Sequence, residues 1–288
     1  MTFLVLGAGG QVGRALVERA GARAIGLTHE DCDICDADAV VRAISRENAS
    51  VVINCAGYTA VDRAEAERER AFAINRDGAA NVARVAASCA LPVIHLSTDY
   101  VYSGSHAGAL TEDCPIAPVN AYGASKAAGD AAVARENASH LVLRVSWVFG
   151  VHGVNFVKTM LRLGHERSEL RIVDDQVGGP TEARDIADAI LTMAKACRVP
   201  GFRDWGIYHF AGAPSTSWCA FARVIFEGAS MRSPNVVPIP SSAYPTLARR
   251  PLNSMLDCER IGRVFAIAQP DWQVALKRVL KALGDLKE

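Results

Sequence analysis

The feature that most constrains the fold is a regular alternation of short apolar segments with longer helical stretches in the first half of the chain. Five apolar segments have the length of strands: residues 3–6, 24–27, 51–55, 92–97 and 141–146. Four stretches with helical character alternate with them: residues 12–20, 38–46, 63–88 (with a break near Asn75) and 121–136. Strands that are apolar throughout are buried on both faces, and strands joined through helices pair in parallel. The sequence therefore predicts an α/β protein with a doubly wound, Rossmann-type parallel sheet.

A glycine-rich turn follows the first predicted strand. Gly7, Gly10 and Gly13 form a GxxGxxG pattern, and Gln11 and Val12 lead from it into the first helix. In dinucleotide-binding folds the first glycine permits a tight turn, the second lets the backbone approach a pyrophosphate, and the third lets helix and strand pack closely. An ordinary glycine turn is the alternative, but the place between a strand and a helix favours a dinucleotide site.

The end of the second predicted strand bears on which dinucleotide binds. It continues as Thr28-His29-Glu30, with no carboxylate at the first positions to hold an NAD ribose and no arginine to hold a 2′-phosphate. Thr28 and His29 suit either cofactor, so NADPH and NADH both stay open, with NADPH slightly favoured. Asp33 and Ile34 are expected beside the adenine, although Asp33 equally suits a solvated turn.

The second half of the chain is less regular. Helices are predicted over residues 156–163, 185–196, 218–227 and 272–283, and a strand over residues 207–210. Prolines cluster between residues 234 and 251, which indicates loops and short strands. We expect two parts, a dinucleotide-binding domain of residues 1–146 plus about 182–211, and a smaller substrate-binding lobe of residues about 147–181 plus 212–288.

Composition argues against several classes of protein. The 288-residue chain carries 31 Lys and Arg against 31 Asp and Glu, so it has no net charge to attract nucleic acid. No apolar run approaches the ~20 residues of a membrane span, and the apolar N-terminus lacks the basic leader of a signal peptide. The eight cysteines are scattered as in reducing compartments, and the pair Cys32 and Cys35 has no second pair with which to bind zinc. We expect a cytoplasmic protein with no nucleic-acid or membrane partner.

A tyrosine and a lysine stand one helical turn apart on the fourth predicted helix. Tyr122 and Lys126 form a Tyr-x-x-x-Lys pattern, which places both side chains on one helix face. A free tyrosine has a pKa of ~10, and a nearby ammonium lowers that pKa. The phenol can then protonate a carbonyl oxygen as a hydride reaches the carbon. The pattern also arises by chance, so its neighbours matter.

Two further segments end at the same predicted edge of the sheet. Thr98 follows the fourth strand, where parallel sheets bind ligands, and its hydroxyl can polarise a substrate oxygen. A turn or helix cap is the alternative role for Thr98. Ala56 and Gly57 follow the third strand, and their small size would let a nicotinamide riboside lie close. An ordinary strand-end turn is compatible with the same residues.

Eight motifs spread over nearly the whole chain resemble one family. They are GAGGQVG from Gly7, NCAGYTAVDRAE from Asn54, STDYVYSG from Ser97, YGASKAAGD from Tyr122, RVSWVFG from Arg144, NFVKTML from Asn155, DQVGGPT from Asp175 and AYPTLARRPLNSMLD from Ala243. The last four are far more specific than a glycine triplet. On these residues the chain resembles the dTDP-4-dehydrorhamnose reductase family of the extended short-chain dehydrogenases.

The resemblance implies an activity and a set of site residues. The activity is reduction, by NADPH or NADH, of the C4 keto group of dTDP-6-deoxy-L-lyxo-4-hexulose to dTDP-L-rhamnose. Catalysis is implied for Tyr122, Lys126 and Thr98. Substrate contacts are implied for a second set, namely Asp99, Tyr100, Trp147, Thr59 and Val61, with Asn155 and Arg250 as further candidates for the substrate's pyrophosphate or base. Trp147 offers a sugar ring a flat face, and the alternative is that it is a core residue. Arg250 offers a phosphate the planar fork of its guanidinium, and the alternative is that it is a surface charge.

The chain departs from one feature of that family. Some members bind a divalent metal through glutamates at a dimer interface. Ala15 stands where one of these glutamates is expected, Arg184 stands where a second is expected, and the C-terminal helix carries Lys281-Ala282-Leu283 without a glutamate. We therefore expect no metal and leave the oligomeric state, monomer or homodimer, open.

Two other functions remain open. A reductase of another dTDP-linked 4-keto-6-deoxyhexose would share these motifs, because the product depends on which face of the sugar meets the nicotinamide. A non-catalytic binding subunit, like the family relative that regulates methionine adenosyltransferase, would act through a partner, but the intact set of Thr98, Tyr122 and Lys126 favours catalysis. Whether an epimerase binds to the chain is also not fixed by the sequence.

Overall fold

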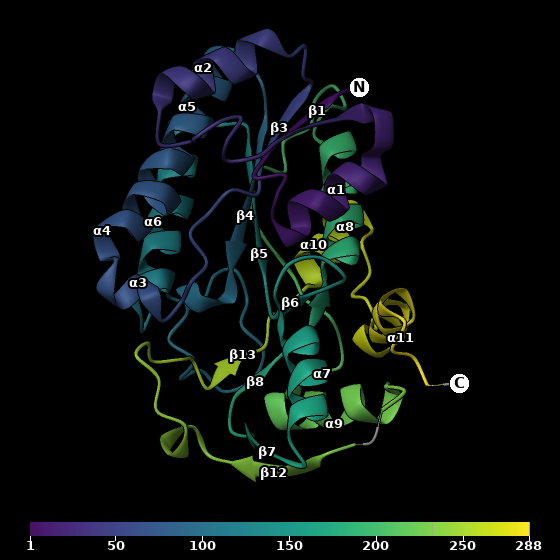
Figure 1. Cartoon of the computed structure of the whole chain (residues 1–288). Helices are drawn as coiled ribbons and strands as arrows, with labels where there is room; N and C mark the ends of the chain where they lie inside the picture. The colour runs from purple at the N-terminus through teal and green to yellow at the C-terminus, as the bar shows by residue number, and fades with distance from the viewer. Residues whose placement is uncertain (232, 288) are drawn as a thin grey trace.

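The computed structural model describes residues 1–231 and 233–287 and is built around one six-stranded sheet (Figure 1). Its strands are β1 (Phe3–Leu6), β2 (Ala24–Leu27), β3 (Val51–Asn54), β4 (Val93–Thr98), β5 (His140–Val145) and β10 (Gly206–Phe210). The strand order is β10-β5-β4-β3-β1-β2, and every neighbouring pair is parallel. The predicted fold class, a doubly wound Rossmann-type sheet, is confirmed.

Helices cover both faces of this sheet (Figure 1). One face carries α2 (Ala37–Arg46), α5 (Ala79–Ser88) and α6 (Ala121–Glu136), and the other carries α1 (Gln11–Ala20), α8 (Ala183–Ala196) and α10 (Glu259–Phe265). In β1, Phe3 and Val5 join the core under α1 and α8, whereas Leu4 and Leu6 join the core under α2 and α5. A strand that is apolar on both sides is stable only between two such layers. No helix in the described part of the chain is long and apolar enough to cross a membrane.

The stretch predicted to be helical over residues 63–88, with a break near Asn75, is divided into shorter pieces. They are α3 (Arg63–Ala66), α4 (Arg68–Phe72), the π-helical turn η2 (Ala73–Gly78) and α5. The predicted break near Asn75 falls in the π-helical turn, a local widening that is frequent at functional sites. The amide of Asn75 is buried against Tyr58 and Ser125, and helical periodicity gives no sign of such long-range contacts.

The second half of the chain adds smaller sheets beside the central one. They join β6 (Val148–Phe149) to β9 (Thr181–Glu182), β7 (Glu169–Val173) to β12 (Asn235–Ile239), and β8 (Val177–Gly178) to β11 (Thr216–Ser217) and β13 (Asn253–Ser254). The helices α7 (Phe156–Glu166), α9 (Trp218–Gly228) and α11 (Trp272–Leu283) and the 3₁₀ turns η1 (Gly21–Arg23), η3 (Asp99–Val101) and η4 (Ser241–Ala243) complete the described elements. A core of its own, with Phe149, Phe221 and Trp272, fills this part. The boundaries of the two predicted domains stay a prediction.

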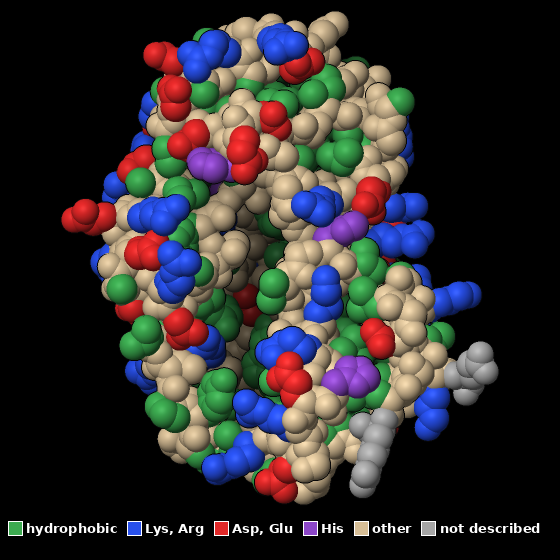
Figure 2. Space-filling model, viewed as in Figure 1, with side chains coloured by type: hydrophobic (Ala, Val, Ile, Leu, Met, Phe, Trp, Pro, Cys, Tyr) green, Lys and Arg blue, Asp and Glu red, His purple; other side chains and the backbone are tan. Residues whose placement is uncertain are grey.

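A groove runs between these two parts of the molecule. The carboxyl ends of β3 and β4 lead toward the small sheets (Figure 1), and Figure 2 shows a hollow down the middle of the same face. Ligands of parallel α/β sheets bind outside the carboxyl ends of the strands. The predicted site residues are therefore expected to line this groove.

Candidate active site

The glycine turn after β1 leaves the start of α1 open to an anion. Gly7 has φ +76°, and a Cβ at this position would lie 2.4 Å from the backbone nitrogen of Ala56. A Cβ on Gly13 would lie 2.3 Å from the carbonyl oxygen of Gly7, so neither position tolerates a side chain. Gly10 differs, because a Cβ there would meet nothing closer than 3.4 Å. It is also the N-cap residue of α1, so no side chain bonds the first N–H groups of the helix. The free N–H groups and dipole of α1 suit a phosphate at this point.

Gln11 and Asn155 link the glycine turn to the second half of the chain. The Asn155 amide donates to Gln11 Oε1 at 3.0 Å and to the carbonyl of Gly150 at 2.8 Å, and its Oδ1 accepts from the backbone of Lys158 at the start of α7. The side chain of Val12 is buried in the core, and its contact with a cofactor stays a prediction. Asn155 therefore positions a loop beside the predicted cofactor, and its contact with substrate stays a prediction.

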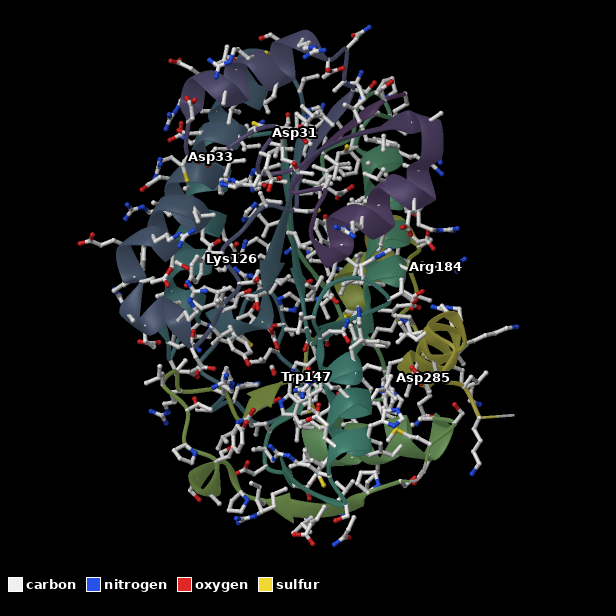
Figure 3. The ribbon with its side chains drawn as sticks, in the orientation of Figure 1. Asp31, Asp33, Lys126, Trp147, Arg184 and Asp285 are labelled. Carbon is white, nitrogen blue, oxygen red and sulfur yellow. The ribbon has the colours of Figure 1, made fainter. Side chains whose placement is uncertain are left out.

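A carboxylate that the sequence analysis missed lies at the end of β2. Asp31 accepts hydrogen bonds from both the backbone N–H and the hydroxyl of Thr28, each at 2.8 Å. These two bonds hold the pKa of Asp31 below its ordinary value. Figure 3 shows Asp31 and Asp33 at the upper end of the molecule, with Lys126 and Trp147 below them. The signal in the sequence is Thr-x-x-Asp directly after a strand, which forms a local hydrogen-bonded turn.

Asp33 and Ile34 have different surroundings. Asp33 is exposed and accepts a hydrogen bond from the backbone of Cys35 at 2.9 Å. Ile34 is 3% exposed and packs against Gly78, where a Cβ would lie 2.7 Å from its side chain. Ile34 thus belongs to the core under α2 and α5, and Asp33 is a turn residue at its edge. Their contact with an adenine remains a prediction.

The turn after β3 lies against the predicted catalytic lysine. Gly57 is exposed, and a Cβ there would lie 4.0 Å from Lys126 Nζ and 3.1 Å from Asn75 Oδ1. Asn75, which the sequence analysis did not assign to the site, bonds both backbone groups of Tyr58, at 2.8 and 3.0 Å. The Asn75 side chain therefore fixes the turn that contains Ala56 and Gly57.

Tyr122 and Thr98 meet at the carboxyl end of β4. Tyr122 lies in the first turn of α6, whose cap residue Asn120 accepts a hydrogen bond from Gly123 N at 2.7 Å. The hydroxyl of Thr98, the last residue of β4, lies close enough to the phenol to influence the pKa of Tyr122. The ring of Tyr100 contacts that of Tyr122 edge-on, with centroids 5.8 Å apart. Local helix capping and the end of a central strand thus bring together two of the three predicted catalytic residues.

The phenol of Tyr122 keeps its proton in this structure. Burial raises the pKa of Tyr122 above its ordinary value, and the nearby Thr98 hydroxyl offsets only part of that increase. Lys126 is not among the groups that shift this pKa, and its Nζ is bonded to the carbonyl oxygen of Leu96 on β4. The predicted lowering of the Tyr122 pKa by Lys126 is therefore wrong. A protonated phenol is nonetheless the form that a proton donor needs.

Lys126 is held from behind by β4. Its Nζ donates to the carbonyl oxygen of Leu96 at 2.7 Å and lies 3.2 Å from His95 Nε2, and the side chain is only 5% exposed. Burial lowers the pKa of Lys126 to about 8, while the charge of Asp130 opposes the shift. His95 was not among the predicted site residues, because a single histidine in an apolar strand carries no local signal.

Asp99 lies beneath Thr98 and not on the surface of the groove. It is 2% exposed and accepts hydrogen bonds from Thr98 Oγ1 at 2.9 Å and from Ser146 Oγ at 3.0 Å. Burial raises the pKa of Asp99 to about 6. Since the one hydroxyl proton of Thr98 is donated to Asp99, that hydroxyl can donate to Tyr122 only when the proton turns away from Asp99. The prediction that Thr98 donates to the substrate oxygen requires this proton to turn away from Asp99.

Trp147 does not present the free flat face that was predicted. Its ring stacks on that of Trp218 with centroids 3.5 Å apart and planes at 4°, and only 9% of the residue is exposed. A Cβ on Gly178 would lie 2.6 Å from the indole nitrogen. The backbone φ of Trp147 is +44°, in the left-handed region that large side chains rarely adopt. Trp147 is thus fixed by its neighbours and can offer a substrate only an edge of its ring.

An ion pair joins the segment after β3 to the chain before β13. Arg250 donates to both carboxylate oxygens of Asp62, at 3.1 and 2.6 Å, and the backbone of Ala248 donates to the same carboxylate at 3.1 Å. Thr59 is exposed and Val61 half-buried on the segment that carries Asp62. Arg250 is therefore neither free in solvent nor isolated, and the bridge brings it to the same side as Thr59 and Val61.

The carboxylates near the predicted position of the family's metal are already paired. Glu182 and Asp185 both accept hydrogen bonds from Arg278 of α11, the latter at 2.6 Å. Arg184 is exposed on α8, toward α11 in Figure 3, and Ala15 is buried on α1. Within the described residues no group of three or more His, Cys, Asp or Glu side chains is arranged to hold a metal ion.

Comparisons with other sequences give one consistent result. A protein-family model described as the RmlD substrate binding domain matches residues 1–284. The dTDP-4-dehydrorhamnose reductase of Sinorhizobium fredii is 40% identical over 289 aligned residues, covering 98% of this chain and 98% of that protein. That of Aggregatibacter actinomycetemcomitans is 41% identical over 286 aligned residues, covering 96% and 97%.

Solved structures agree with the sequence comparisons. The dTDP-4-dehydrorhamnose reductase of Clostridium acetobutylicum superimposes with a TM-score of 0.93 at 32% identity, over 99% of this chain and 100% of that one. The enzyme of Bacillus anthracis, solved in complex with NADP, gives a TM-score of 0.91 at 34% identity, over 98% and 100%.

Proposed function

This chain belongs to the dTDP-4-dehydrorhamnose reductase family, and we infer that it reduces the C4 keto group of dTDP-6-deoxy-L-lyxo-4-hexulose to give dTDP-L-rhamnose. The reductant is NADPH or NADH, in keeping with the relative that was solved with NADP. The observation that carries the proposal is the meeting of Tyr122 with Thr98 at the end of β4, with Lys126 one helical turn away.

The glycine turn fits a nicotinamide dinucleotide. Gly10 leaves the start of α1 without a side-chain cap, and we assign its free N–H groups to the phosphates. When bound, the reduced nicotinamide supplies the hydride that the carbonyl carbon accepts. Ala56 and Gly57 lie on the turn nearest Lys126, and we assign them to the nicotinamide riboside. Their small size and exposed backbone permit close approach by a flat ligand.

We assign the proton of the new hydroxyl group to Tyr122. Its phenol is protonated at neutral pH and the residue is half-buried, which suits transfer to the carbonyl oxygen of a bound substrate. The transfer leaves a phenolate, which Thr98 stabilises when its hydroxyl proton turns from Asp99. Lys126, one helical turn along α6, is assigned to the nicotinamide ribose, because its Nζ lies beside the Gly57 turn. Tyr122 and Thr98 supply acid catalysis, Lys126 holds the cofactor beside them, and the hydride comes from outside the chain.

Substrate contacts are proposed on the other side of the groove. The ring of Tyr100, next to that of Tyr122, is assigned to the sugar. Thr59 and Val61 are assigned to the substrate, and Arg250 to its pyrophosphate or base, because the ion pair with Asp62 holds Arg250 on their side of the groove. The remaining predicted contacts are assigned to holding the groups that line the groove in place, through the bonds and packing described above; they are Asp99, Trp147 and Asn155.

The substrate class also fits the global properties of the chain. We propose a cytoplasmic enzyme that acts on a dissolved nucleotide sugar as a monomer or a homodimer. Its formal net charge of zero offers no long-range attraction to nucleic acid or to an anionic membrane. Because the chain has no net charge, the recognition of an anionic substrate depends on local groups such as Arg250.

Replacement of Tyr122 by phenylalanine tests the proton donor. The variant loses about 10²–10⁴-fold in kcat, as expected for loss of a general acid, while cofactor affinity stays within about twofold. Consumption of NADPH or NADH is followed by absorbance, with dTDP-4-keto-6-deoxyhexose supplied with and without an epimerase. Tyr208→Phe is the control, because it removes a phenol of β10 that donates to the Asp204 carbonyl oxygen at 2.6 Å. Normal turnover in Tyr122→Phe would assign the proton to another group.

A further inference from the structure

His95 is a polar side chain at the centre of the apolar sheet. It has no exposed surface, and it lies on β4 between Asn54 of β3 and Val142 of β5. A buried imidazole is unfavourable unless its nitrogens have hydrogen-bond partners. Both nitrogens do, since Nδ1 lies 3.2 Å from Asn54 Nδ2 and Nε2 lies 3.2 Å from Lys126 Nζ. His95 therefore connects a strand-end amide to the predicted catalytic lysine.

The amide of Asn54 determines which nitrogen of His95 carries the proton. Asn54 Oδ1 accepts a hydrogen bond from the backbone N–H of Ala56 at 3.1 Å, so it is Nδ2 that faces the imidazole. An amide nitrogen only donates, and His95 Nδ1 must then accept. Burial keeps the imidazole neutral, because it holds the pKa of His95 well below its ordinary value. A neutral ring with an accepting Nδ1 carries its proton on Nε2.

The Nε2–H of His95 points at Lys126 Nζ, and an ammonium has no lone pair to accept it. A lysine ammonium has three donors and no acceptor, whereas a neutral amine keeps one lone pair. Lys126 Nζ already donates to the carbonyl oxygen of Leu96 at 2.7 Å. The hydrogen bonds that start at Ala56 and pass through Asn54 and His95 therefore end on the lone pair of a neutral amine.

We propose that Asn54 and His95 are positioning residues that set the pH at which Lys126 takes up its proton. With its proton on Nε2, His95 favours the neutral amine. Protonation of Lys126 requires that proton to move to Nδ1 and the Asn54 amide to turn over, which releases the N–H of Ala56 beside Gly57. The charge on Lys126 is thereby coupled to the predicted cofactor turn. The inference rests on the proposed function only in giving Lys126 a catalytic task.

The other groups that face Lys126 act on the same equilibrium. Burial lowers the pKa of Lys126 to about 8, and Asp130 on α6 and Cys55 after β3 oppose the shift. Asp130 forms an ion pair with Arg144 of β5 at 3.0 Å, which weakens its effect on the pKa of Lys126. Tyr122, one turn earlier on α6, stays protonated because burial raises its pKa. The coupling should therefore be visible in the mildly alkaline range.

Nuclear magnetic resonance of the protein alone, with ¹⁵N-labelled histidine, tests the tautomer. The imidazole nitrogens shift strongly with protonation, and the His95 pair is assigned through its contacts with the Asn54 amide. We expect the proton on Nε2 at about pH 10 and on Nδ1 at about pH 6, with the change centred on the Lys126 titration. A proton that stays on one nitrogen throughout, or that lies on Nδ1 at about pH 10, overturns the proposal. No substrate or cofactor is needed, so the result is independent of the proposed activity.

The pH profile of kcat tests the consequence for turnover. A glutamine at position 95 can turn its carbonyl oxygen to the ammonium, so His95→Gln moves the alkaline limb up by about one pH unit, a tenfold change in proton affinity. His209→Gln is the matched control, since it replaces another fully buried histidine, one bonded to Tyr102 and Leu110, and it leaves the limb in place. An unshifted limb in a folded His95→Gln variant overturns the proposal.

Discussion

Single carboxylates at the ends of the central strands are oriented by their neighbours in the fold. Asp31 accepts two hydrogen bonds from Thr28 after β2, and Asp99 accepts from Thr98 and Ser146 after β4. Their positions therefore do not depend on a ligand. A site with its groups already fixed loses less conformational freedom when it binds.

Replacement of Asp31 by asparagine should change cofactor preference. A carboxylate near the end of the second strand favours the ribose hydroxyls of NADH and repels the 2′-phosphate of NADPH. Loss of one charge at a few ångströms in a solvated site changes the relative affinity by roughly fivefold. We expect the ratio of kcat/KM for NADPH to that for NADH to rise by this factor. Asp38→Asn, the same change in the first turn of α2, is the control and should leave the ratio unaltered. An unchanged ratio in Asp31→Asn would show that Asp31 does not contact the ribose.

At the scale of elements, the start of α1 shows how backbone conformation makes a binding site. Gly7 and Gly13 are required because a Cβ at either position would lie 2.4 or 2.3 Å from backbone atoms, whereas a Cβ at Gly10 would have room. If packing were the only reason for glycine here, a Cβ would be excluded at all three positions. The open position at Gly10, directly at the helix N-terminus, is the one that a bound phosphate would occupy.

A matched pair of alanine variants separates these two uses of glycine. Gly10→Ala should fold with nearly unchanged thermal stability but bind cofactor about tenfold more weakly, because the methyl group displaces one charge-assisted hydrogen bond. Gly13→Ala should lower the melting temperature instead, since its Cβ would overlap the Gly7 carbonyl. Calorimetry and cofactor fluorescence measure the two effects. Full cofactor affinity in Gly10→Ala would place the phosphates elsewhere.

Across the whole molecule, buried polar chains join segments that are far apart in the sequence. Arg144 of β5 bonds Asp130 at 3.0 Å and Tyr102 at 2.6 Å, and Tyr102 contacts His209 of β10 at 2.7 Å. His209 is neutral in the fold, because burial lowers its pKa to about 3. Such a network is favourable only while each member keeps its partner, so it ties the stability of the sheet to pH.

Acidification should therefore destabilise the fold through His209. A histidine in the unfolded chain has a pKa of ~6.5, so below that pH the unfolded chain binds a proton at His209 that the native chain does not bind. The stability of the fold therefore falls as the pH falls. His209→Gln should reduce this slope between about pH 6.5 and 5 by up to about 1.4 kcal/mol per pH unit. Urea unfolding at several pH values measures the slope, with His106→Gln, at an exposed position, as control. Equal slopes in both variants would contradict the assignment.

Much of the site followed from local patterns. The glycine turn, Thr98 and the pair of Tyr122 and Lys126 were found because each is carried by a short motif beside a predicted strand or helix. The inward direction of Lys126 was not foreseen, because it depends on Leu96 and on a histidine thirty-one positions away in the chain. The free face of Trp147 was wrongly expected for a similar reason, since its stacking partner is distant in the sequence.

The sequence by itself determined the layers of the fold, because apolar periodicity fixes which face of each element is buried and glycine spacing fixes where the backbone can turn. The tertiary structure decided the protonation and the orientation of the site. Whether Tyr122 is acidic, which nitrogen of His95 carries a proton and where the Arg250 fork points depend on desolvation and on hydrogen bonds between remote segments. Those interactions exist only when the chain is packed, so no local pattern records them.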